Sequence, residues 1–406
     1  MKVQNIIGAV VLARHGDRQG FYQDPTTYAA SNAVITPLGN QQEYQLGELL
    51  RSLYLDTSSS TYIPGISTDL VNVSQIQVRA DAGGEGGVIF SSAVSLLQGL
   101  YPPTTEYQTT LANGTTIIAS PLIRSLAVES VEPDNDISLE SWTDCGTFSN
   151  ATTAFYNSAE FAAKKVSNEA FLDELPSYLD GRNVSLENMW NIYDYMNVEY
   201  IHNATFADNL PITFLPQARD LANWHEMGVF TSPSIDGIGN IAGRTVLPTI
   251  LDAFQQIVAG EDGLKLVYVA ISYKPFLSLF NMTGVFEMNP EIEGIVNYAA
   301  AVVFELYNST SGTEIRFKFK NGTDDPGFSI YRMLGSYDDV SLTTFIDTLA
   351  PTSINSTLDW CKICSNHDDC GCSELNPVAS TLDTTVLATS DASEGHLSSW
   401  AHFLEP

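Results

Sequence analysis

The sequence predicts an α/β fold: a mixed, mainly parallel central sheet flanked by helices, with a smaller helical domain inserted. Three observations predict it. Apolar runs rich in β-branched residues alternate with helical patterns over the first hundred residues, helical patterns dominate the middle of the chain, and strand patterns return after residue 264. Strands that alternate with helices indicate crossover connections and hence parallel pairing. With 406 residues, 44% of them hydrophobic, the chain can bury a large core.

The first hundred residues predict strand, helix, strand and helix in turn. Residues 6–13 are a continuous apolar run, which is typical of a strand buried on both faces. Thr36 followed by Pro37 predicts a helix start, because Thr is a good N-cap and Pro suits the first turn. Residues 75–79 predict a second strand, and FSSAVSLLQGLYPP predicts the helix after it. We expect both strands to end at the same edge of the sheet, each with an arginine near its end.

The rest of the chain divides into a helical middle and a second group of strands. Helical patterns run from about residue 158 to 257, and strand patterns occupy residues 265–271, 301–307 and 314–320, the last two as a hairpin. The predicted domains are an α/β core of residues 1–104 and 261–372, a mostly helical insertion or cap of residues 105–260, and a loosely packed tail of residues 373–406.

Composition and charge favour a protein that works outside the cell. The net charge of −30 argues against binding to nucleic acid or to anionic membranes, and no stretch is long enough to span a membrane. Because the first apolar segment leads directly into Arg14 and His15, we do not expect it to be a cleaved signal peptide. Nine N-x-S/T triplets favour a secreted glycoprotein, extracellular or in a cell wall, with N-linked glycans. Their asparagines are Asn72, Asn113, Asn150, Asn183, Asn203, Asn281, Asn308, Asn321 and Asn355.

Five cysteines suit an oxidising location but leave the pairing open. Four lie in CKICSNHDDCGC and the fifth is Cys145, so one thiol is left over or bridges to another chain. The cysteine cluster contains the His367-Asp368 pair, for which a polar loop between disulfides is favoured over a zinc site. We therefore expect no metal and no cofactor, and the oligomeric state stays open.

The residues with chemical potential follow the first strand, in the sequence RHGDR. Arg14, Arg18 and Arg79 offer planar, bidentate donors that match phosphate oxygens. His15 stands between two arginines, and like charge disfavours its imidazolium form, so that it can act as a neutral nucleophile. The pattern predicts attack of His15 on phosphorus, with arginines stabilising the phosphoryl oxygens. The competing interpretation is a solvated loop after a strand.

RHGDR after an apolar strand resembles the signature of the histidine phosphatase superfamily, in its acid phosphatase and phytase branch. TPLGNQQEYQLGELLRS is similar to the helix that follows in that family, and QVRA followed by SSAVSLLQGLYPP is similar to its next strand and helix. The similarity covers most of residues 5–104 and the strands of residues 264–320, and a fungal source would fit it. The resemblance implies an α/β core with an inserted helical domain. It also implies a phosphohistidine on His15, with Arg14, Arg18 and Arg79 holding the phosphoryl group.

The sequence departs from that family at two places. The family carries a His-Asp pair after a later strand, where the aspartate protonates the leaving oxygen, and the corresponding residues here are Ser272 and Tyr273. The segment after Arg79 is the glycine-rich ADAGGEGG, which contains Asp81 and Glu85. The mutase branch of the superfamily uses a glutamate as proton donor, so Glu85 is a candidate for a relocated general acid. The alternative is a solvated glutamate in a glycine loop.

Three functions stay open at this point. The first is a secreted phosphomonoesterase whose general acid is non-standard. The second is a catalytically impaired relative that acts as an anion-binding extracellular glycoprotein, and the third is another reaction in the same pocket, such as phosphoryl transfer to an acceptor other than water. The expected partner is a small phosphate-bearing substrate or inorganic phosphate. Phytase activity is less favoured, because the negative charge would repel a hexaphosphate. His225, in NWHEMG, is expected to be a surface histidine.

Overall fold

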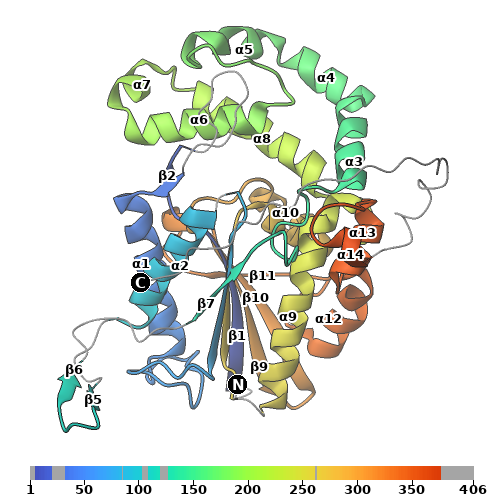
Figure 1. The fold of residues 1–406 in the computed structure, drawn as a ribbon. Coiled ribbons are helices and arrows are strands. Elements are labelled where there is room, and N and C mark those ends of the chain that lie inside the picture. The colour runs from blue at the N-terminus through green and yellow to red at the C-terminus, as the bar shows by residue number, and fades with distance from the viewer. Residues whose placement is uncertain are drawn as a thin grey trace, which may run out of the picture.

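The computed structural model describes residues 5–20, 33–84, 86–102, 108–118, 127–260 and 263–375. A central sheet carries helices on both faces, and a further group of helices lies above one end of it (Figure 1). The strands follow the order β11-β10-β9-β1-β8-β4-β7, and β12 pairs with β10. The bounds of these strands are β1 (Asn5–Arg14), β4 (Ile76–Asp81), β7 (Val128–Val131), β8 (Leu266–Ile271), β9 (Ala301–Ser309), β10 (Gly312–Lys320), β11 (Ser329–Tyr331) and β12 (Val340–Ser341).

One half of the sheet is parallel and the other is antiparallel. β1, β8, β4 and β7 run parallel to one another, whereas β9 is antiparallel to β1, and β10 and β11 continue in alternating directions. The mixed α/β class predicted from the sequence is confirmed. Because β1 lies inside the sheet, its carboxyl end is flanked by the end of β8 on one side and by the chain entering β9 on the other.

The core elements occur close to where the sequence predicts them. The five predicted strands correspond to β1, β4, β8, β9 and β10, and the last two form the predicted hairpin. α1 (Pro37–Tyr54) begins with Thr36 as N-cap, whose hydroxyl accepts a hydrogen bond from the backbone N–H of Gly39 at 3.0 Å. α2 (Gly86–Leu100) is the predicted second helix.

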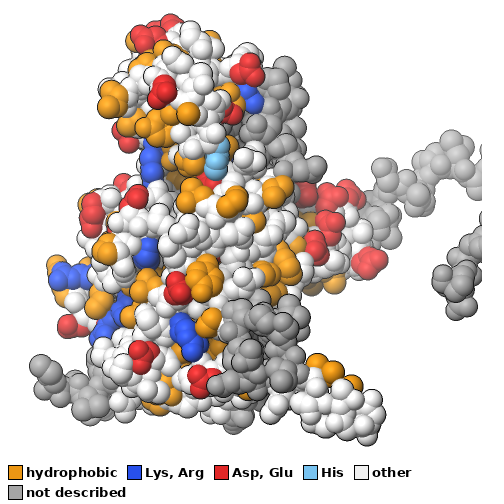
Figure 2. Space-filling view, turned by 90° about the vertical axis from the view of Figure 1, so that its left-hand side faces the viewer, with side chains coloured by type: hydrophobic (Ala, Val, Ile, Leu, Met, Phe, Trp, Pro, Cys, Tyr) orange, Lys and Arg blue, Asp and Glu red, His pale blue; other side chains and the backbone are white. Residues whose placement is uncertain are grey.

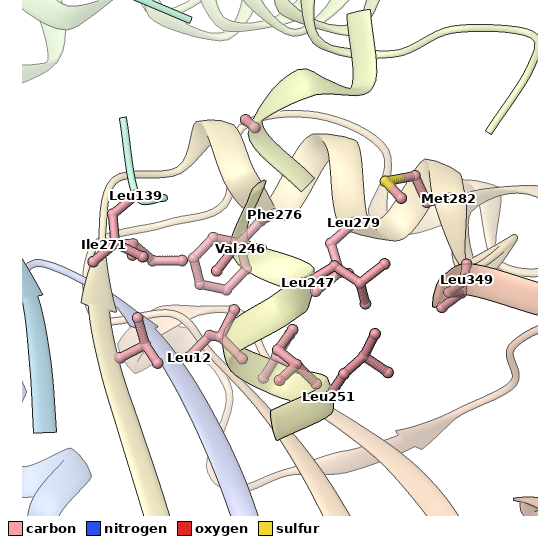
Figure 3. Packing of buried hydrophobic residues seen from close by; sticks show 14 of the residues in the cluster. Leu12, Leu139, Val246, Leu247, Leu251, Ile271, Phe276, Leu279, Met282 and Leu349 are labelled. Atoms are coloured by element: carbon pink, nitrogen blue, oxygen red, sulfur yellow. The ribbon is translucent and has the colours of Figure 1, made fainter. Parts of the chain in front are cut away.

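Each face of the sheet is covered by a different set of helices. α1 and α2 pack on one face, and α9 (Ile241–Ala259) packs on the other together with α10 (Lys274–Met282). Figure 3 shows the second face, where Leu12 of β1 and Ile271 of β8 lie against Val246 and Leu251 of α9. The remaining helices on that side are α11 (Val285–Met288), α12 (Leu342–Leu349), α13 (Thr357–Cys364) and α14 (Cys372–Leu375).

A helical cap lies above the carboxyl ends of the parallel strands (Figure 1). It has its own apolar core, and in the space-filling view it joins the body of the protein at a waist (Figure 2). Its helices are α3 (Gly146–Tyr156), α4 (Ala159–Ser167), α5 (Glu169–Glu174), α6 (Met189–His202), α7 (Ala204–Asn209) and α8 (Phe214–Phe230). β7 and α9 also fall within residues 105–260, but they belong to the sheet and its cover. The predicted domain division stays a prediction, and the helices of that range that lie above the sheet are α3 to α8.

Two small β-pairs complete the description. β2 (Arg18–Gln19) begins at the last residue of RHGDR and pairs with β3 (Val34–Ile35). β5 (Gln108–Thr110) pairs with β6 (Thr116–Ile118) in a hairpin that projects from the lower end of the body (Figure 1). The predicted tail lies outside the described residues from position 376 onwards.

One disulfide ties the base of the cap to α13, and a second joins α13 to α14. Cys145 pairs with Cys364, and Cys361 pairs with Cys372. The fifth cysteine, Cys370, is a buried free thiol, and burial raises its pKa to about 11. The first disulfide links residues 219 positions apart, so it constrains a long loop of the unfolded chain.

Most of the predicted glycan acceptors lie on the surface. Asn281 and Asn321 are half-buried, and the amide oxygen of each accepts a backbone hydrogen bond, from Ser232 and Asn297 respectively. The other seven acceptor asparagines are exposed. Within the described ranges, the protein has no helix both long enough and apolar enough to cross a membrane.

A buried ion pair joins two neighbouring strands. Glu305 of β9 is fully buried and accepts hydrogen bonds from Lys318 Nζ (2.6 Å), the Tyr54 hydroxyl (2.8 Å) and the Tyr307 hydroxyl (2.5 Å). Burial and the charge of Glu305 raise the pKa of Tyr54 well above its usual value, so this phenol stays protonated and donates. The carboxylate is therefore fully satisfied inside the sheet.

Candidate active site

The RHGDR loop is fixed by backbone hydrogen bonds at the end of β1. Arg14 N–H donates to Ala300 O at 2.8 Å, and His15 N–H donates to Ile271 O at 3.2 Å. Ala299 N–H donates to His15 O at 3.1 Å. The loop is thus attached to the end of β8 and to the chain entering β9, which fixes where its side chains start.

The helices on the first face hold the second half of the loop. Gly16 N–H donates to the Ser92 hydroxyl of α2 at 3.0 Å, and Asp17 N–H donates to the Gln42 side chain of α1 at 2.9 Å. The backbone of Gly39 lies directly against the loop: a Cβ at this position would come 2.1 Å from Asp17 O. The absence of a side chain at Gly39 is what allows α1 to approach this closely.

The His15 imidazole is buried and has a defined tautomer. Its Nδ1 lies 2.8 Å from Gly16 O, and because a carbonyl oxygen only accepts hydrogen bonds, Nδ1 carries the hydrogen. In the neutral ring Nε2 then bears the lone pair. The ring lies 5.6 Å from that of Tyr298, so one side of the imidazole packs on an aromatic ring. His15 is therefore arranged as a nucleophile through Nε2.

The Arg14 guanidinium is held between two aromatic rings. It lies 4.5 Å from the ring centroid of Tyr298 and 5.1 Å from that of Tyr273, and its Nη1 donates to Val296 O at 2.5 Å. Its Nε–H is buried and has no hydrogen-bond partner among the described residues. A fixed guanidinium with an unused buried donor is suited to an anionic ligand.

The Arg18 guanidinium makes a bidentate ion pair with an acidic residue of the cap. Its Nη1 and Nη2 donate to the two carboxylate oxygens of Asp194 in α6 at 3.2 and 2.9 Å. The side chain of Arg18 is 3% exposed and that of Asp194 is 14% exposed. Nothing in the sequence around Asp194 indicates this contact, because it joins residues 176 positions apart.

Arg14, Arg18 and Asp194 line one small cavity below the cap. Its volume is about 20 Å³, enough for one or two water molecules and too small for a phosphate ester. The other lining residues are Trp190, Tyr193, Tyr273, Lys274 and Ile295. The walls are thus largely aromatic and the charges mostly positive. Because the cavity is so small, a substrate must displace side chains that now fill the site.

A second charged contact links the cap to the loop. His202 Nε2, at the end of α6, lies 2.9 Å from the fully buried carboxylate of Asp17, which also accepts a hydrogen bond from the Thr36 hydroxyl. This contact connects α6 to the loop. Asp17 in turn connects α6 to the N-cap of α1.

Ser272 and Tyr273, which stand at the positions of the His-Asp pair in the similar family, lie beside the loop. Ser272 and Tyr273 follow β8 directly, and the Tyr273 hydroxyl donates to the carboxylate of Glu226 in α8 at 2.6 Å. His225 donates to the same carboxylate through Nδ1 at 2.9 Å, and its Nε2 lies 2.9 Å from the Tyr156 hydroxyl. The expectation of a surface histidine at position 225 is wrong: the residue is 1% exposed, because it faces the interior of the cap.

The structure places Arg79 away from the loop cluster, against the expectation from the sequence. Arg79 is level with Val269 in β8, and Val269 is level with Leu12 in β1, so Arg79 lies one pleat before Arg14. Its guanidinium forms ion pairs with Glu129 at 2.9 Å and Asp136 at 2.5 Å. It also donates to the hydroxyls of Thr249 at 2.7 Å and Ser138 at 3.3 Å. The pairing register of β4 is the physical reason for this position.

The acidic candidates after β4 are placed only in part. Asp81 is buried, and its Oδ1 accepts a hydrogen bond from Gly83 N–H at 2.9 Å. Glu85 lies outside the described residues. The neighbouring Gly84 N–H donates to the Glu140 carboxylate at 3.1 Å, so an acidic side chain lies against this loop.

In the part of the chain that the structure covers, no three His, Cys, Asp or Glu side chains are grouped so that they could hold a metal ion. Asp194 and Glu226 are the site residues that sequence reasoning missed. A signal for the second existed, because His225 and Glu226 are adjacent titratable residues in a segment with a helical pattern. Asp194 had no such signal.

Comparison with known proteins finds acid phosphatases among the relatives in sequence. No protein-family model matches the chain. It is 23% identical over 322 residues to lysosomal acid phosphatase from Rattus norvegicus, covering 77% of this chain and 70% of that protein. It is also 21% identical over 366 residues to prostatic acid phosphatase from Bos taurus, covering 87% of each.

Solved structures show the same fold. The phytase from Citrobacter braakii matches with a TM-score of 0.58 and 13% identity, over 86% of this chain and 98% of that one. The phytase from D. castellii matches with a TM-score of 0.53 and 12% identity, over 96% of this chain and 88% of that one. The solved structures thus show the fold, and the sequence matches make the chain similar to acid phosphatases, homologues that belong to the histidine acid phosphatase branch of the histidine phosphatase superfamily.

Proposed function

We propose that this protein is a secreted phosphomonoesterase that transfers the phosphoryl group of its substrate to His15 and then to water. The observation that carries the proposal is the hydrogen bond from His15 Nδ1 to Gly16 O, which leaves the lone pair on Nε2. Arg14 and Arg18 of the same loop line one cavity and supply the positive charge that a phosphoryl group needs.

The reaction has two displacement steps. The Nε2 lone pair of His15 attacks phosphorus, the bond from phosphorus to the ester oxygen breaks, and that oxygen leaves with a proton from a general acid. Water then attacks the phosphohistidine, the P–N bond breaks, and inorganic phosphate leaves with His15 restored. Splitting the hydrolysis in this way replaces one difficult step by two easier ones.

Arg14 and Arg18 form the phosphate site in this proposal. The unused Nε–H of Arg14 can donate to a phosphoryl oxygen without giving up the bond to Val296. Arg18 becomes available when its pairing with Asp194 is exchanged for one with phosphate. Arg79 is left out of the clamp, because its donors are used by Glu129, Asp136 and hydroxyl groups.

The surroundings favour small monoesters over inositol hexakisphosphate. The cavity walls include Trp190, Tyr193 and Tyr273, and Lys274 is the third cation among the lining residues. A hexaphosphate needs a wide, basic surface, whereas this chain carries a net charge of −30. The similar solved structures include phytases, so hexakisphosphate hydrolysis is the direct test of this point.

A location outside the cell is part of the proposal. Two disulfides and seven exposed N-x-S/T asparagines support an oxidising, glycosylating route. The match to lysosomal acid phosphatases is compatible with that route.

The test is capture of the phosphoenzyme. We expect acid-sensitive label on the wild-type protein after brief incubation with a ³²P-labelled monoester, and none on His15→Ala. His15→Ala should also lower kcat/KM for p-nitrophenyl phosphate by at least about 10³-fold, because the nucleophile is removed. His367→Ala, an exposed histidine on the cysteine loop, is the matched control and should behave as wild type.

The alternative is a protein that binds phosphate without turning it over. The pairing of Arg18 with Asp194 and the presence of Ser272-Tyr273 in place of His-Asp favour it. Wild type that hydrolyses no faster than His15→Ala, yet binds inorganic phosphate in calorimetry, would establish this alternative and rule out the hydrolase.

A further inference from the structure

We propose that Asp194 of the cap is the proton donor for the leaving group, and that phosphate binding itself prepares it for this role. This inference rests on the proposed function, because it assigns the general acid that the reaction at His15 requires. The positions of the family's His-Asp pair do not supply it. Tyr273 directs its hydroxyl hydrogen to Glu226 at 2.6 Å, and an aliphatic alcohol such as Ser272 is too weak an acid.

Asp194 is the acidic residue among those that line the cavity with Arg14 and Arg18. It reaches the site from α6, on the side opposite the β1 loop, and its side chain is 14% exposed. A substrate held by the arginines would therefore lie between the loop that carries His15 and the helix that carries Asp194. In-line displacement needs this order, with the nucleophile and the leaving oxygen on opposite sides of phosphorus.

The ion pair with Arg18 explains how a carboxylate can acquire a proton when it is needed. Before substrate binds, both terminal nitrogens of Arg18 donate to the two carboxylate oxygens of Asp194. A phosphoryl group that binds Arg18 must take these donors, because the cavity of about 20 Å³ has no room beside them. The displaced carboxylate then loses its counter-ion and faces a second anion, and both changes favour its protonated form.

The charged and titratable groups that face Asp194 agree with this exchange. Arg14 and Lys274 line the same cavity, as do the phenols of Tyr193 and Tyr273. Burial raises the pKa of Tyr298, which also senses the charges of Arg18 and Asp194, so this phenol stays neutral. Arg14, Arg18 and Lys274 are therefore the cations of this cavity for which phosphate and Asp194 compete.

The proton balance is complete in both steps. In the first step the Asp194 carboxylic acid gives its proton to the ester oxygen as the P–O bond breaks, and the alcohol leaves. In the second step the Asp194 carboxylate accepts a proton from the attacking water as the P–N bond breaks. His15 is restored. Asp194 takes up one proton from solvent when substrate replaces it at Arg18, and it returns that proton to solvent when phosphate leaves and the pair with Arg18 forms again.

The test compares Asp194→Asn with wild type on two substrates that differ in leaving group. The leaving group of glycerol phosphate is an alkoxide unless an acid protonates it. The leaving group of p-nitrophenyl phosphate is p-nitrophenolate, a stable anion that leaves without protonation. We expect kcat for glycerol phosphate to fall by about 10² to 10⁴-fold and kcat for p-nitrophenyl phosphate to change by less than about tenfold. The inhibition constant of inorganic phosphate should fall, because an amide competes less well for Arg18.

Matched variants separate this role from a structural one. Asp208→Asn makes the same change at an exposed position of α7 in the same cap and should behave as wild type. Asp194→Glu keeps a carboxyl group and should recover at least about tenfold of the glycerol phosphate turnover lost in Asp194→Asn. Circular dichroism and thermal melting establish that each variant is folded.

Three results would overturn the inference. One is an equal loss of both substrates in Asp194→Asn, and another is no loss of either. The third is a leaving-group-dependent loss in Glu85→Gln that is absent from Asp194→Asn, which would make Glu85 the donor. Failure of the proposed function looks different, because wild type would then match His15→Ala on both substrates whatever stands at position 194.

Discussion

Replacing Gly39 by alanine tests how the fold positions the catalytic loop. Gly39 is in the first turn of α1, and a Cβ there would lie 2.1 Å from Asp17 O and 2.8 Å from Asp17 N. Real Cβ atoms essentially never come within 3.0 Å of another heavy atom, so helix and loop must separate by about 1 Å. The obstacle is backbone on both sides, which cannot rotate away as a side chain can.

The size of the effect follows from this displacement. Forcing one extra carbon into a packed contact costs about 1–3 kcal/mol. The free energy of unfolding of Gly39→Ala should fall by that amount. The loop that moves carries His15 two residues before Asp17, and a shift of about 1 Å in catalytic geometry costs up to about 10²-fold in rate. We therefore expect kcat to fall by up to about 10²-fold in a protein that is still folded at the assay temperature.

Urea denaturation and p-nitrophenyl phosphate kinetics measure the two effects. Gly87→Ala is the control, because Gly87 is in the first turn of α2 with nothing within 4 Å of the added carbon. That variant should keep full activity and gain about 0.5–1 kcal/mol, since alanine favours a helix over glycine. Wild-type stability and activity in Gly39→Ala would refute the claim that this close contact positions the loop.

Two further predictions concern ion pairs. Lys318→Met leaves the fully buried Glu305 without its cation, so the free energy of unfolding measured in urea should fall by about 3–5 kcal/mol. The double variant with Glu305→Gln should recover much of this loss. Equal stability of Lys318→Met and wild type would contradict the prediction. Burial raises the pKa of Asp136, but hydrogen bonds from Ser138 and the charge of Arg79 outweigh it, and the pKa is lowered overall. Its charged form thus stabilises the fold above the unfolded pKa near 3.8, and this contribution is lost as the pH falls through the lower folded value. Asp136→Asn should therefore cost up to about 1 kcal/mol at pH 7 and less at pH 3, and a cost independent of pH would contradict the assignment.

The core of the fold could be predicted because its signals are local. The continuous apolar run of residues 6–13 and the Thr36-Pro37 start each depend on a few neighbouring residues, and both occur as predicted. The cap was predicted only as helical. Its helices bury their faces against one another, so periodicity gives their presence but not which side of α6 faces the loop.

The site was predictable where one motif contains it. His15, Arg14 and Arg18 come together because they share one loop, and the end of a parallel strand fixes its place. The sequence led us to expect Arg79 beside Arg14. How far along the sheet Arg79 lies depends on the pairing register of β4 with β8, which no local pattern reveals. Asp194 could not be found at all, since its contact depends on how the whole cap is seated.

α6 combines two tasks at separate points along its length. Trp190, Tyr193 and Asp194 from its first half line the cavity, whereas His202 at its end contacts Asp17. Positions 194 and 202 lie about 12 Å apart along the helix axis. Phosphate can therefore replace Asp194 at Arg18 while His202 still holds the other end of the helix to the loop. Because the second contact is between His202 and a fully buried carboxylate, loss of the first need not release the cap. Exchange at Arg18 then opens the site locally, and the same helix keeps Asp194 close enough to donate its proton.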